Sequence, residues 1–387
     1  MEMRKEEKLL SEAQRLRELF FEQADSIERA RRVPSELSKM MAKAGFYALG
    51  VPKEIGGLEA PPKLSSQIFE ILAQGDASCA WVAFIGTTSG TALAGLAEKT
   101  AKAVFSSPTT MLTGVFAPTG RAEITDNGFK VSGRWQWGSG SQNADWVTGG
   151  CILTKNGDPI LNKKGTPVSH MMVMPAKSIE YLDTWHVSGL NGSGSLDYQV
   201  ENLFVPTSHA VGYQHKSSFN GALFRFPPIT FLALGIAAVT LGIARASINE
   251  FLLLAKSKKR VQSRTTVADQ PYTHLKLAEA EARLRSARAF YYQALDAAWE
   301  GTLNDGRASV ELRRDLRLAT THAVSASIKV IDAMYALGGG TSVYKTSRLQ
   351  RYMRDVQVAR QHIMVAPSTL ETVGRLLLGV DANTSML

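Results

Sequence analysis

The sequence predicts an α+β protein, mainly α-helical, with helices at both ends and strands between them. Apolar residues recur at helical spacing over 3–107, short β-rich runs separated by Gly, Asn, Asp and Pro fill 110–210, and helical spacing returns at Ile229. We therefore expect three units: an N-terminal helical domain (1–109), a β domain (110–212) and a C-terminal four-helix bundle (213–387).

The N-terminal unit has clear helix signals. Leu9, Leu16 and 19–21 place apolar side chains on one helical face, and a second helix is expected at Ser35, directly after a proline. Turn residues interrupt the pattern at 52–57. A long apolar region follows from 64 to 96.

The middle and C-terminal units are predicted from changes in the spacing of apolar residues along the sequence. Strands are expected at Met111–Phe116, Phe129–Trp137, Trp146–Leu153 and His170–Met174. Four long helices are expected around 229–255, 277–298, 312–337 and 346–378, packed antiparallel.

Composition narrows the function classes. The chain has 387 residues and a formal charge of +9, but its basic residues are scattered rather than clustered with aromatics, which disfavours nucleic-acid binding. Its two cysteines have no metal-ligand or disulfide spacing, and the N-terminus lacks an apolar signal core, so a reducing cytosol and no metal are expected. The apolar run 229–244 is shorter than the roughly 20 residues of a membrane span and is expected to be a buried helix.

Three segments carry the functional signal. Near the C-terminus, a glycine-rich turn (336–341) precedes the pair Arg354–Asp355 and a lone His362. The second segment, 133–140, reads Gly-Arg-Trp-Gln-Trp-Gly-Ser-Gly, and the third, 188–197, is rich in Gly and Ser. Each is weak alone, but their order along the chain is informative.

Together these segments resemble the acyl-CoA dehydrogenase superfamily over nearly the whole chain. The resemblance implies an N-terminal helical domain, a β-barrel-like middle domain and a four-helix bundle. Dehydrogenases of that family carry a catalytic Glu eight residues after the Asp. Ile363, which cannot take a proton, occupies that position here, with His362 beside it. This favours the branch of two-component flavin-dependent monooxygenases.

The resemblance implies where flavin would bind. Trp137 would pack against the flavin rings and the Ser139 hydroxyl would reach the flavin N5. The segment holding Phe116 and Pro118 lies where dehydrogenases have a Glu-Pro-Gly loop over the flavin pyrimidine, and its acidic residue is absent.

Flavin phosphates would contact residues across a subunit interface. The candidates are Arg260, Arg264 and Gln270, together with the turn formed by Gly338, Gly339, Gly340 and Thr341. Lys259 also fits the family spacing, so the choice among Lys259, Arg260 and Arg264 stays open. A shared site implies a homo-oligomer, and a tetramer is the family habit.

His362 is the expected catalytic residue, with Ser139, because an imidazole titrates near neutrality and can donate to the oxygenated flavin or exchange a proton. Arg354 and Asp355 are expected to form an ion pair that holds their helix. Trp81, Phe84 and Phe224 are expected to line the substrate pocket. Phenol-hydroxylating relatives often use a second His from the N-terminal region; no His precedes His170 here, which favours indole-like or sulfur-containing substrates over phenols.

The sequence therefore predicts the oxygenase component of a two-component monooxygenase. Reduced flavin (FMNH2 or FADH2) from a separate reductase would react with O2, and the resulting flavin hydroperoxide would transfer one oxygen atom to an aromatic or heteroaromatic small molecule. No Gly-x-Gly-x-x-Gly fingerprint for NAD is present, which fits a separate reductase. Two alternatives stay open: an acyl-CoA dehydrogenase, with Glu371 as its base, and a non-catalytic flavin-binding bundle protein.

Overall fold

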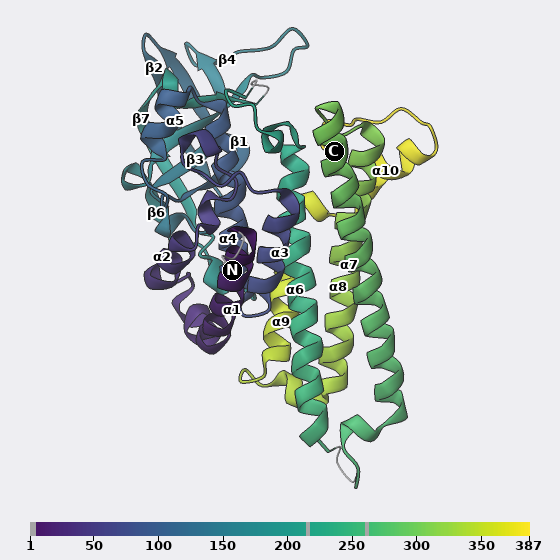
Figure 1. Cartoon of the computed structure of the whole chain (residues 1–387). Helices are drawn as coiled ribbons and strands as arrows, with labels where there is room; N and C mark the ends of the chain where they lie inside the picture. The colour runs from purple at the N-terminus through teal and green to yellow at the C-terminus, as the bar shows by residue number, and fades with distance from the viewer. Residues whose placement is uncertain (1–4, 214–216, 260–262) are drawn as a thin grey trace.

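The computed structural model describes residues 5–213, 217–259 and 263–387. Helices fill the chain up to Val104, strands run from Leu112 to Gly212, and helices return at Pro228. This confirms the expected α+β, mainly α-helical fold. Figure 1 shows the sheet at the upper left, the N-terminal helices below it and the long bundle on the right.

The N-terminal helices are α1 (Lys5–Ala30), α2 (Ser35–Lys43), α3 (Pro62–Ala73), α4 (Ala77–Gly90) and α5 (Glu98–Val104). The apolar region noted over 64–96 contains two α-helices, α3 and α4. Gly75 and Asp76 separate them: a Cβ at Gly75 would lie 2.2 Å from the Arg17 carbonyl oxygen, and the Asp76 carboxylate caps α4 by accepting from Cys79 N–H at 2.9 Å. This break turns α4 back across α3.

The strands form one mixed sheet in the order β6-β7-β2-β1-β3-β5-β8, with β4 paired to β3. Their bounds are β1 (Leu112–Thr125), β2 (Gly128–Trp135), β3 (Trp146–Lys155), β4 (Asp158–Pro159), β5 (Ser169–Pro175), β6 (Glu180–Leu182), β7 (Asp197–Pro206) and β8 (Ala210–Gly212). β1 and β3 pair in parallel, and the other pairs are antiparallel. Trp135 is buried within the sheet, where its indole N–H donates to the Gly150 carbonyl at 2.8 Å.

The bundle contains α6 (Pro228–Ser257), α7 (Pro271–Asp305), α8 (Val310–Gly338), α9 (Arg348–Ala359) and α10 (Thr369–Leu377). By length and composition α6 could cross a membrane, but 83% of its most apolar 18-residue stretch is buried inside the protein. It packs against α3 and α4 on one side and α8 on the other, which accounts for its apolar surface.

The fourth bundle helix differs from the expectation. One continuous helix over 346–378 was expected, but α9 ends at Ala359 and α10 begins at Thr369, with the short 3-10 helix η11 (Ile363–Val365) between them. Pro367 explains part of the break, because it disfavours helical backbone at Ala366, whose ψ is 148°. His362 therefore lies in a connector and not on a helix.

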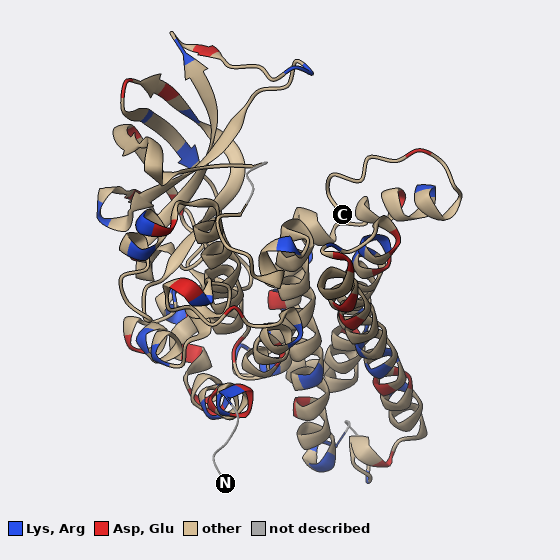
Figure 2. Cartoon of the chain, turned by 45° about the horizontal axis from the view of Figure 1, so that its top comes forward, with Lys and Arg blue, Asp and Glu red and all other residues tan. Residues whose placement is uncertain are grey.

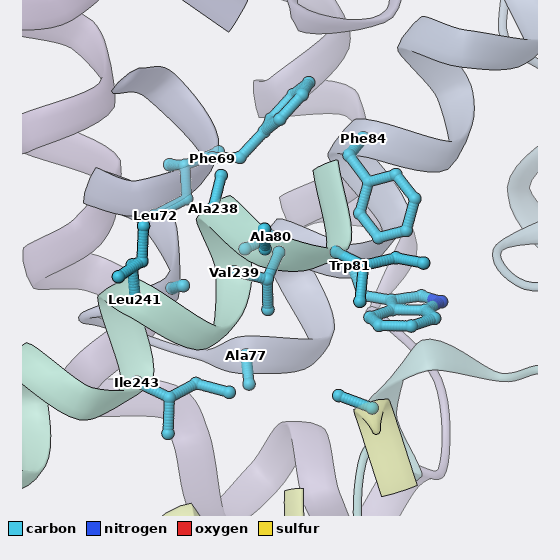
Figure 3. Close-up of a cluster of buried hydrophobic side chains, with 14 of the residues drawn as sticks. Phe69, Leu72, Ala77, Ala80, Trp81, Phe84, Ala238, Val239, Leu241 and Ile243 are labelled. Atoms are coloured by element: carbon cyan, nitrogen blue, oxygen red, sulfur yellow. The ribbon is translucent and has the colours of Figure 1, made fainter. Parts of the chain in front are cut away.

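Helices α3, α4 and α6 join the N-terminal unit to the bundle through one apolar cluster, drawn in Figure 3. Two glycines of α6 allow the close approach: a Cβ at Gly235 would lie 2.6 Å from the Phe84 ring, and one at Gly242 would lie 2.4 Å from the Glu70 carbonyl oxygen. Trp81 lies at the edge of this cluster, with its ring edge-on to Phe84 at a centroid distance of 4.8 Å. The core thus fixes Trp81 from behind.

Charged side chains are spread over the helices. Figure 2 shows Lys and Arg interspersed with Asp and Glu along the N-terminal helices and the bundle. Several pair across elements, including Arg245 with Glu281 at 2.6 Å and Arg288 with Glu70 at 2.6 Å. This distribution is typical of solvated helix faces.

Candidate functional site

Trp81 and Ser139 lie at the centre of the candidate site. Trp81 comes from α4, and Ser139 from the loop that follows β2. The Trp81 indole N–H donates to Ser139 Oγ at 3.1 Å, and both side chains are buried. The N-terminal helices and the sheet therefore meet at this hydrogen bond.

A chain of hydroxyls continues from Ser139. Its Oγ lies 2.7 Å from Ser195 Oγ, which lies 2.7 Å from Ser193 Oγ. Backbone bonds hold the two segments together, because Gly138 N–H donates to the Leu196 carbonyl and Gly140 N–H to the Ser193 carbonyl, each at 2.9 Å. The Trp-Gly-Ser and Gly/Ser-rich segments, read separately in the sequence, thus form one structure.

The hydroxyl chain determines whether Ser139 can donate its proton to a ligand. Ser139 accepts from Trp81, so if it also accepts from Ser195, its own proton is free to bond a ligand. If Ser139 instead donates to Ser195, the hydrogen-bond direction is reversed. The hydroxyls can switch between the two arrangements by rotation alone.

Trp137 presents an aromatic surface beside this chain. Its side chain is 67% exposed, unusually high for tryptophan, and its backbone is left-handed, with φ of 68°. Non-glycine residues in this region carry strain that occurs preferentially at ligand sites. An exposed indole two residues from a buried serine fits a flavin ring system, so the residues present suit the expected cofactor.

His362 faces the same tryptophan from the bundle side. Its ring centroid lies 6.2 Å from that of Trp81, and its Nδ1 accepts from Met364 N–H at 3.2 Å. Burial lowers the pKa of His362 to about 4, so the ring is neutral at physiological pH. Since Nδ1 is an acceptor, the proton of the neutral ring resides on Nε2.

Of the two positions considered for the carboxylate of a dehydrogenase, one holds no acid and the other is exposed. Ile363 is 67% exposed, and Glu371 is exposed in the first turn of α10, beyond the break in the fourth helix. The polar side chain that the connector brings to Trp81 is the imidazole of His362. This geometry favours hydrogen-bond donation over proton abstraction by a carboxylate.

The expected ion pair between Arg354 and Asp355 is wrong. Arg354 instead pairs with Glu28 of α1 at 2.6 Å and donates to the Ser188 carbonyl at 2.6 Å. Asp355 accepts from Leu190 N–H at 2.7 Å, and burial raises its pKa to about 7. Neighbouring helical residues point in different directions, about 100° apart, so each binds a different partner. Both hold α9 against the Gly/Ser-rich loop.

The Phe116–Pro118 segment is a bulge within β1 rather than a separate loop. The β1–β3 register shifts between Val115 and Gly120, and Phe116 and Pro118 are exposed. Tyr213 stacks on Phe116 with ring centroids 4.3 Å apart and donates from its hydroxyl to the Phe116 carbonyl. The bulge presents the exposed Phe116 ring to solvent, with the partly buried Tyr213 ring stacked on it.

The glycine turn is contacted by a residue that the sequence did not single out. Lys258, at the C-terminal end of α6, donates from Nζ to the Gly338 carbonyl and to Thr341 Oγ1, the latter at 2.7 Å. It places a positive charge beside Gly339 and Gly340, where a Cβ at Gly340 would meet no atom within 4 Å.

The expected phosphate ligands have different surroundings. Arg260 lies outside the described residues, and Arg264 is exposed. Gln270 donates to Thr265 Oγ1 at 2.9 Å within its own loop. A β-bridge pairs Lys259 with Thr266 just beyond the C-terminal end of α6, which is the end where Lys258 contacts the glycine turn.

The expected substrate-pocket residues have different positions. Trp81 borders the site, whereas Phe84 is fully buried behind it. Phe224 is partly buried and packs on Phe219 at a ring-centroid distance of 6.4 Å. The hydroxyls of Thr87 and Thr88 donate to main-chain carbonyls of Phe46 and Phe84, which engages their protons inside the protein.

Family models match both helical units of the chain. The model described as acyl-CoA dehydrogenase, N-terminal domain, matches residues 4–109, and the one described as acyl-CoA dehydrogenase, C-terminal domain, matches residues 234–367. The second match covers the glycine turn, α9 and the connector with His362.

Individual relatives are flavin monooxygenases. Indole-3-acetate monooxygenase from Pseudomonas putida is 33% identical and covers 91% of this chain and 89% of that protein. The crystal structure of the HsaA monooxygenase from M. tuberculosis superimposes with a TM-score of 0.90 at 25% identity, covering 99% and 100% of the two chains. XiaF from Streptomyces sp., solved with FADH2 and glycerol, gives a TM-score of 0.88 at 25% identity over 97% and 96%. The chain therefore belongs to the acyl-CoA dehydrogenase superfamily and, within it, to the flavin-dependent monooxygenases.

Proposed function

We propose that this protein is the oxygenase component of a two-component monooxygenase that inserts one oxygen atom into an aromatic or heteroaromatic small molecule. The observation that carries the proposal is the placement of the neutral His362 imidazole 6.2 Å from Trp81, whose indole N–H holds Ser139. In this proposal a hydrogen-bond donor would occupy the place where a dehydrogenase needs a carboxylate base.

The flavin rings would lie against Trp137, with the Ser139 hydroxyl as a short donor and the Phe116–Pro118 bulge supplying backbone groups. The phosphate would lie at the turn from Gly338 to Thr341, with Lys258 supplying charge. Reduced flavin, when bound, supplies the two electrons that activate O2; one oxygen atom enters the product and the other leaves as water.

The side chains of this protein control protons and water during that chemistry. His362 would donate a hydrogen bond from Nε2. Because its pKa is about 4, the ring is neutral and not a cation at neutral pH. Ser139 can present its proton outward while Trp81 and Ser195 bond to its oxygen. The apolar cluster behind Trp81 excludes water, which strengthens these bonds.

An indole-like substrate is favoured over a phenol. A phenol needs a base for its hydroxyl, and the Thr87 and Thr88 hydroxyls, which donate to main-chain carbonyls, are not bases. An indole ring is electron-rich without deprotonation. The relative at 33% identity is named for indole-3-acetate, which agrees with this preference.

The proposed partners are a separate flavin reductase and further copies of the chain in a cytoplasmic homotetramer. Relatives named as oxygenase components support the reductase. Exposed apolar side chains lie near the glycine turn and at the start of α7, which supports a subunit interface at that end; they are Tyr272, Leu275, Val343 and Tyr344.

The test combines the purified protein with an independent flavin reductase, NADH, FMN or FAD, and a panel of indole-3-acetate, indole, resorcinol and dibenzothiophene. Mass spectrometry under ¹⁸O₂ should show a product that has gained one ¹⁸O atom. Turnover of an acyl-CoA with an artificial electron acceptor would instead support a dehydrogenase. If the protein gives neither an oxygenated product nor acyl-CoA turnover, the non-catalytic alternative holds, whereas unchanged oxygen insertion and peroxide release in His362→Ala would overturn the role of His362.

A further inference from the structure

A buried arginine lies directly behind the connector that carries His362. Arg317, on α8, is 1% exposed and is among the largest fully buried side chains. Among the residues that the structure describes, its guanidinium bonds to two main-chain carbonyls, those of Met364 at 2.6 Å and Met386. Burial lowers its pKa to about 10, still far above neutrality, so the group is charged.

Burying this arginine costs folding free energy, so a contribution to stability does not explain its presence. A buried cation balanced by carbonyl dipoles loses more hydration than a paired one, and an apolar side chain of similar size would avoid that loss. The arginine does provide direction, because its planar fork fixes two acceptors relative to each other. One acceptor belongs to the connector (360–368) and the other to the C-terminal segment that follows α10 (378–387).

The first acceptor leads to His362. Met364 offers its carbonyl to Arg317 and its N–H to His362 Nδ1, so one residue joins the guanidinium to the imidazole. Holding Met364 in place keeps Nδ1 occupied and therefore keeps the ring proton on Nε2. A shift of Met364 would free the ring to rotate or change tautomer.

The second acceptor brings Met386 and Leu387 to the same point. Leu387 is 5% exposed, and a cavity of about 40 Å³ is lined by residues of all three segments, including Arg317, Met364 and Leu387. Thr321 on α8 bonds to Thr369 at the start of α10 with 2.9 Å between the hydroxyl oxygens. The C-terminal segment thus closes over the back of the connector.

We propose that Arg317 is a positioning residue that clamps the connector and the C-terminal segment to α8 and thereby sets the orientation and tautomer of His362. The inference rests on the proposed function and adds a link between the chain end and the reaction site. Arg317 itself touches neither flavin nor substrate.

The first experiment needs no cofactor. Hydrogen–deuterium exchange of residues 361–366 is measured in the wild type, Arg317→Met, Arg317→Lys and a variant that ends at Ser385. Exchange should be at least about fivefold faster in Arg317→Met, intermediate in Arg317→Lys and about twofold to threefold faster in the shortened chain. The matched control is Arg314→Met, about one helical turn before Arg317 on α8, where the arginine pairs with Asp315 at 2.7 Å; it should exchange like the wild type.

The second experiment measures peroxide release after protein loaded with reduced FMN is mixed with O2, without substrate. Release should be about tenfold faster in Arg317→Met, with partial rescue in Arg317→Lys and no change in Arg314→Met. The proposal would be overturned if exchange in Arg317→Met stayed within twofold of the wild type, or if its peroxide release did so while His362→Ala accelerated release. Should Arg317→Met not fold, wild-type values in both Arg317→Lys and the shortened chain would overturn it.

The two experiments separate this proposal from the proposed function. If His362→Ala releases peroxide at the wild-type rate, the role of His362 fails, while the exchange measurement still decides whether Arg317 holds the connector. If His362→Ala accelerates release but Arg317→Met does not, the proposed function stands and the clamp is wrong.

Discussion

The indole nitrogen of Trp81 donates to Ser139 Oγ at 3.1 Å, and the same ring lies 6.2 Å, centroid to centroid, from the imidazole of His362. Three parts of the chain, from α4, the loop after β2 and the broken fourth helix, therefore converge on one side chain. Because Trp81 packs on Phe84 in the core, its position is set by the fold and not by a ligand.

Replacing Ser139 by Ala should weaken flavin binding and lower stability together. The change leaves the Trp81 N–H and the Ser195 hydroxyl without one partner each, which should reduce the free energy of unfolding by about 1–3 kcal/mol. Flavin affinity should fall by about tenfold, as expected for the loss of one hydrogen bond. Urea unfolding and anaerobic titration of reduced FMN measure the two effects.

Ser141→Ala is the matched control for Ser139→Ala. The Ser141 hydroxyl is also buried in the same loop, but it has no hydrogen-bond partner among the described residues. Its removal should leave stability and flavin affinity unchanged, within about 0.5 kcal/mol. An equal loss in both variants would assign the effect to loop packing.

His362 should make the protein sensitive to mild acid. Its pKa is about 4 in the folded protein and near 6.5 when unfolded, so its contribution is complete above pH 6.5 and is lost as the pH falls toward 4. Between pH 7.5 and 5 the wild type should lose roughly 2 kcal/mol more than His362→Gln, which keeps an acceptor for Met364 N–H. Urea unfolding of both proteins at the two pH values measures this difference, and equal losses would contradict the burial of the imidazole.

Asp355 should have the opposite pH dependence. Burial raises its pKa to about 7, with the nearby Asp76 carboxyl adding to the rise. The unfolded side chain ionises near pH 3.9, so the folded state loses stability as the pH rises from about 4 to 7.

Asp355→Asn keeps an acceptor for Leu190 N–H and removes the titration of the carboxyl. Relative to the wild type, the variant should gain roughly 2–3 kcal/mol between pH 5 and pH 8. The comparison is made by urea unfolding at both pH values. A constant difference between the two proteins would show that Asp355 does not titrate in this range.

Lys258→Met should weaken flavin binding without unfolding the bundle. The change removes the charge and the two hydrogen bonds to the glycine turn, and flavin affinity should fall by about tenfold or more. Lys256→Met is the control, because Lys256 is exposed in the last turn of α6. Fluorescence titration with FMN and FAD measures the affinities, and an equal fall in both variants would point to general electrostatic attraction.

Periodicity in the sequence was sufficient for the architecture but not for the helix boundaries. Helical spacing continues across 346–378, yet the backbone breaks at Ala359, because apolar spacing records which residues face inward and not whether hydrogen bonds are continuous. Pro367 was the available signal for the break. The same limit applied at Asp76, whose capping role lies inside an apolar run.

Residues of the candidate site could be predicted where a sequence motif contains them. They could not be predicted where contacts between distant segments determine their positions. The motifs singled out His362 and Ser139, and the structure places both beside Trp81, which was expected as a wall of the substrate pocket; their roles stay predictions. Lys258 was missed because three neighbouring basic residues follow α6. The direction in which the chain leaves the helix decides which of them reaches the glycine turn. The partners of Arg354 and Asp355 were also unpredictable, since Glu28 and Leu190 are more than 160 residues away.

The interruption in the fourth bundle helix separates the helices that form the bundle from the connector that lies beside the candidate site. Adding one residue inside a helix would rotate everything after it by about 100° and disturb the packing. The stretch between Ala359 and Thr369 lacks that helical constraint, so exposed positions such as Gln361 and Ile363 can exchange side chains while Met364 stays bonded to Arg317 of α8. Residues 360–368 are therefore where we would begin to redesign substrate preference.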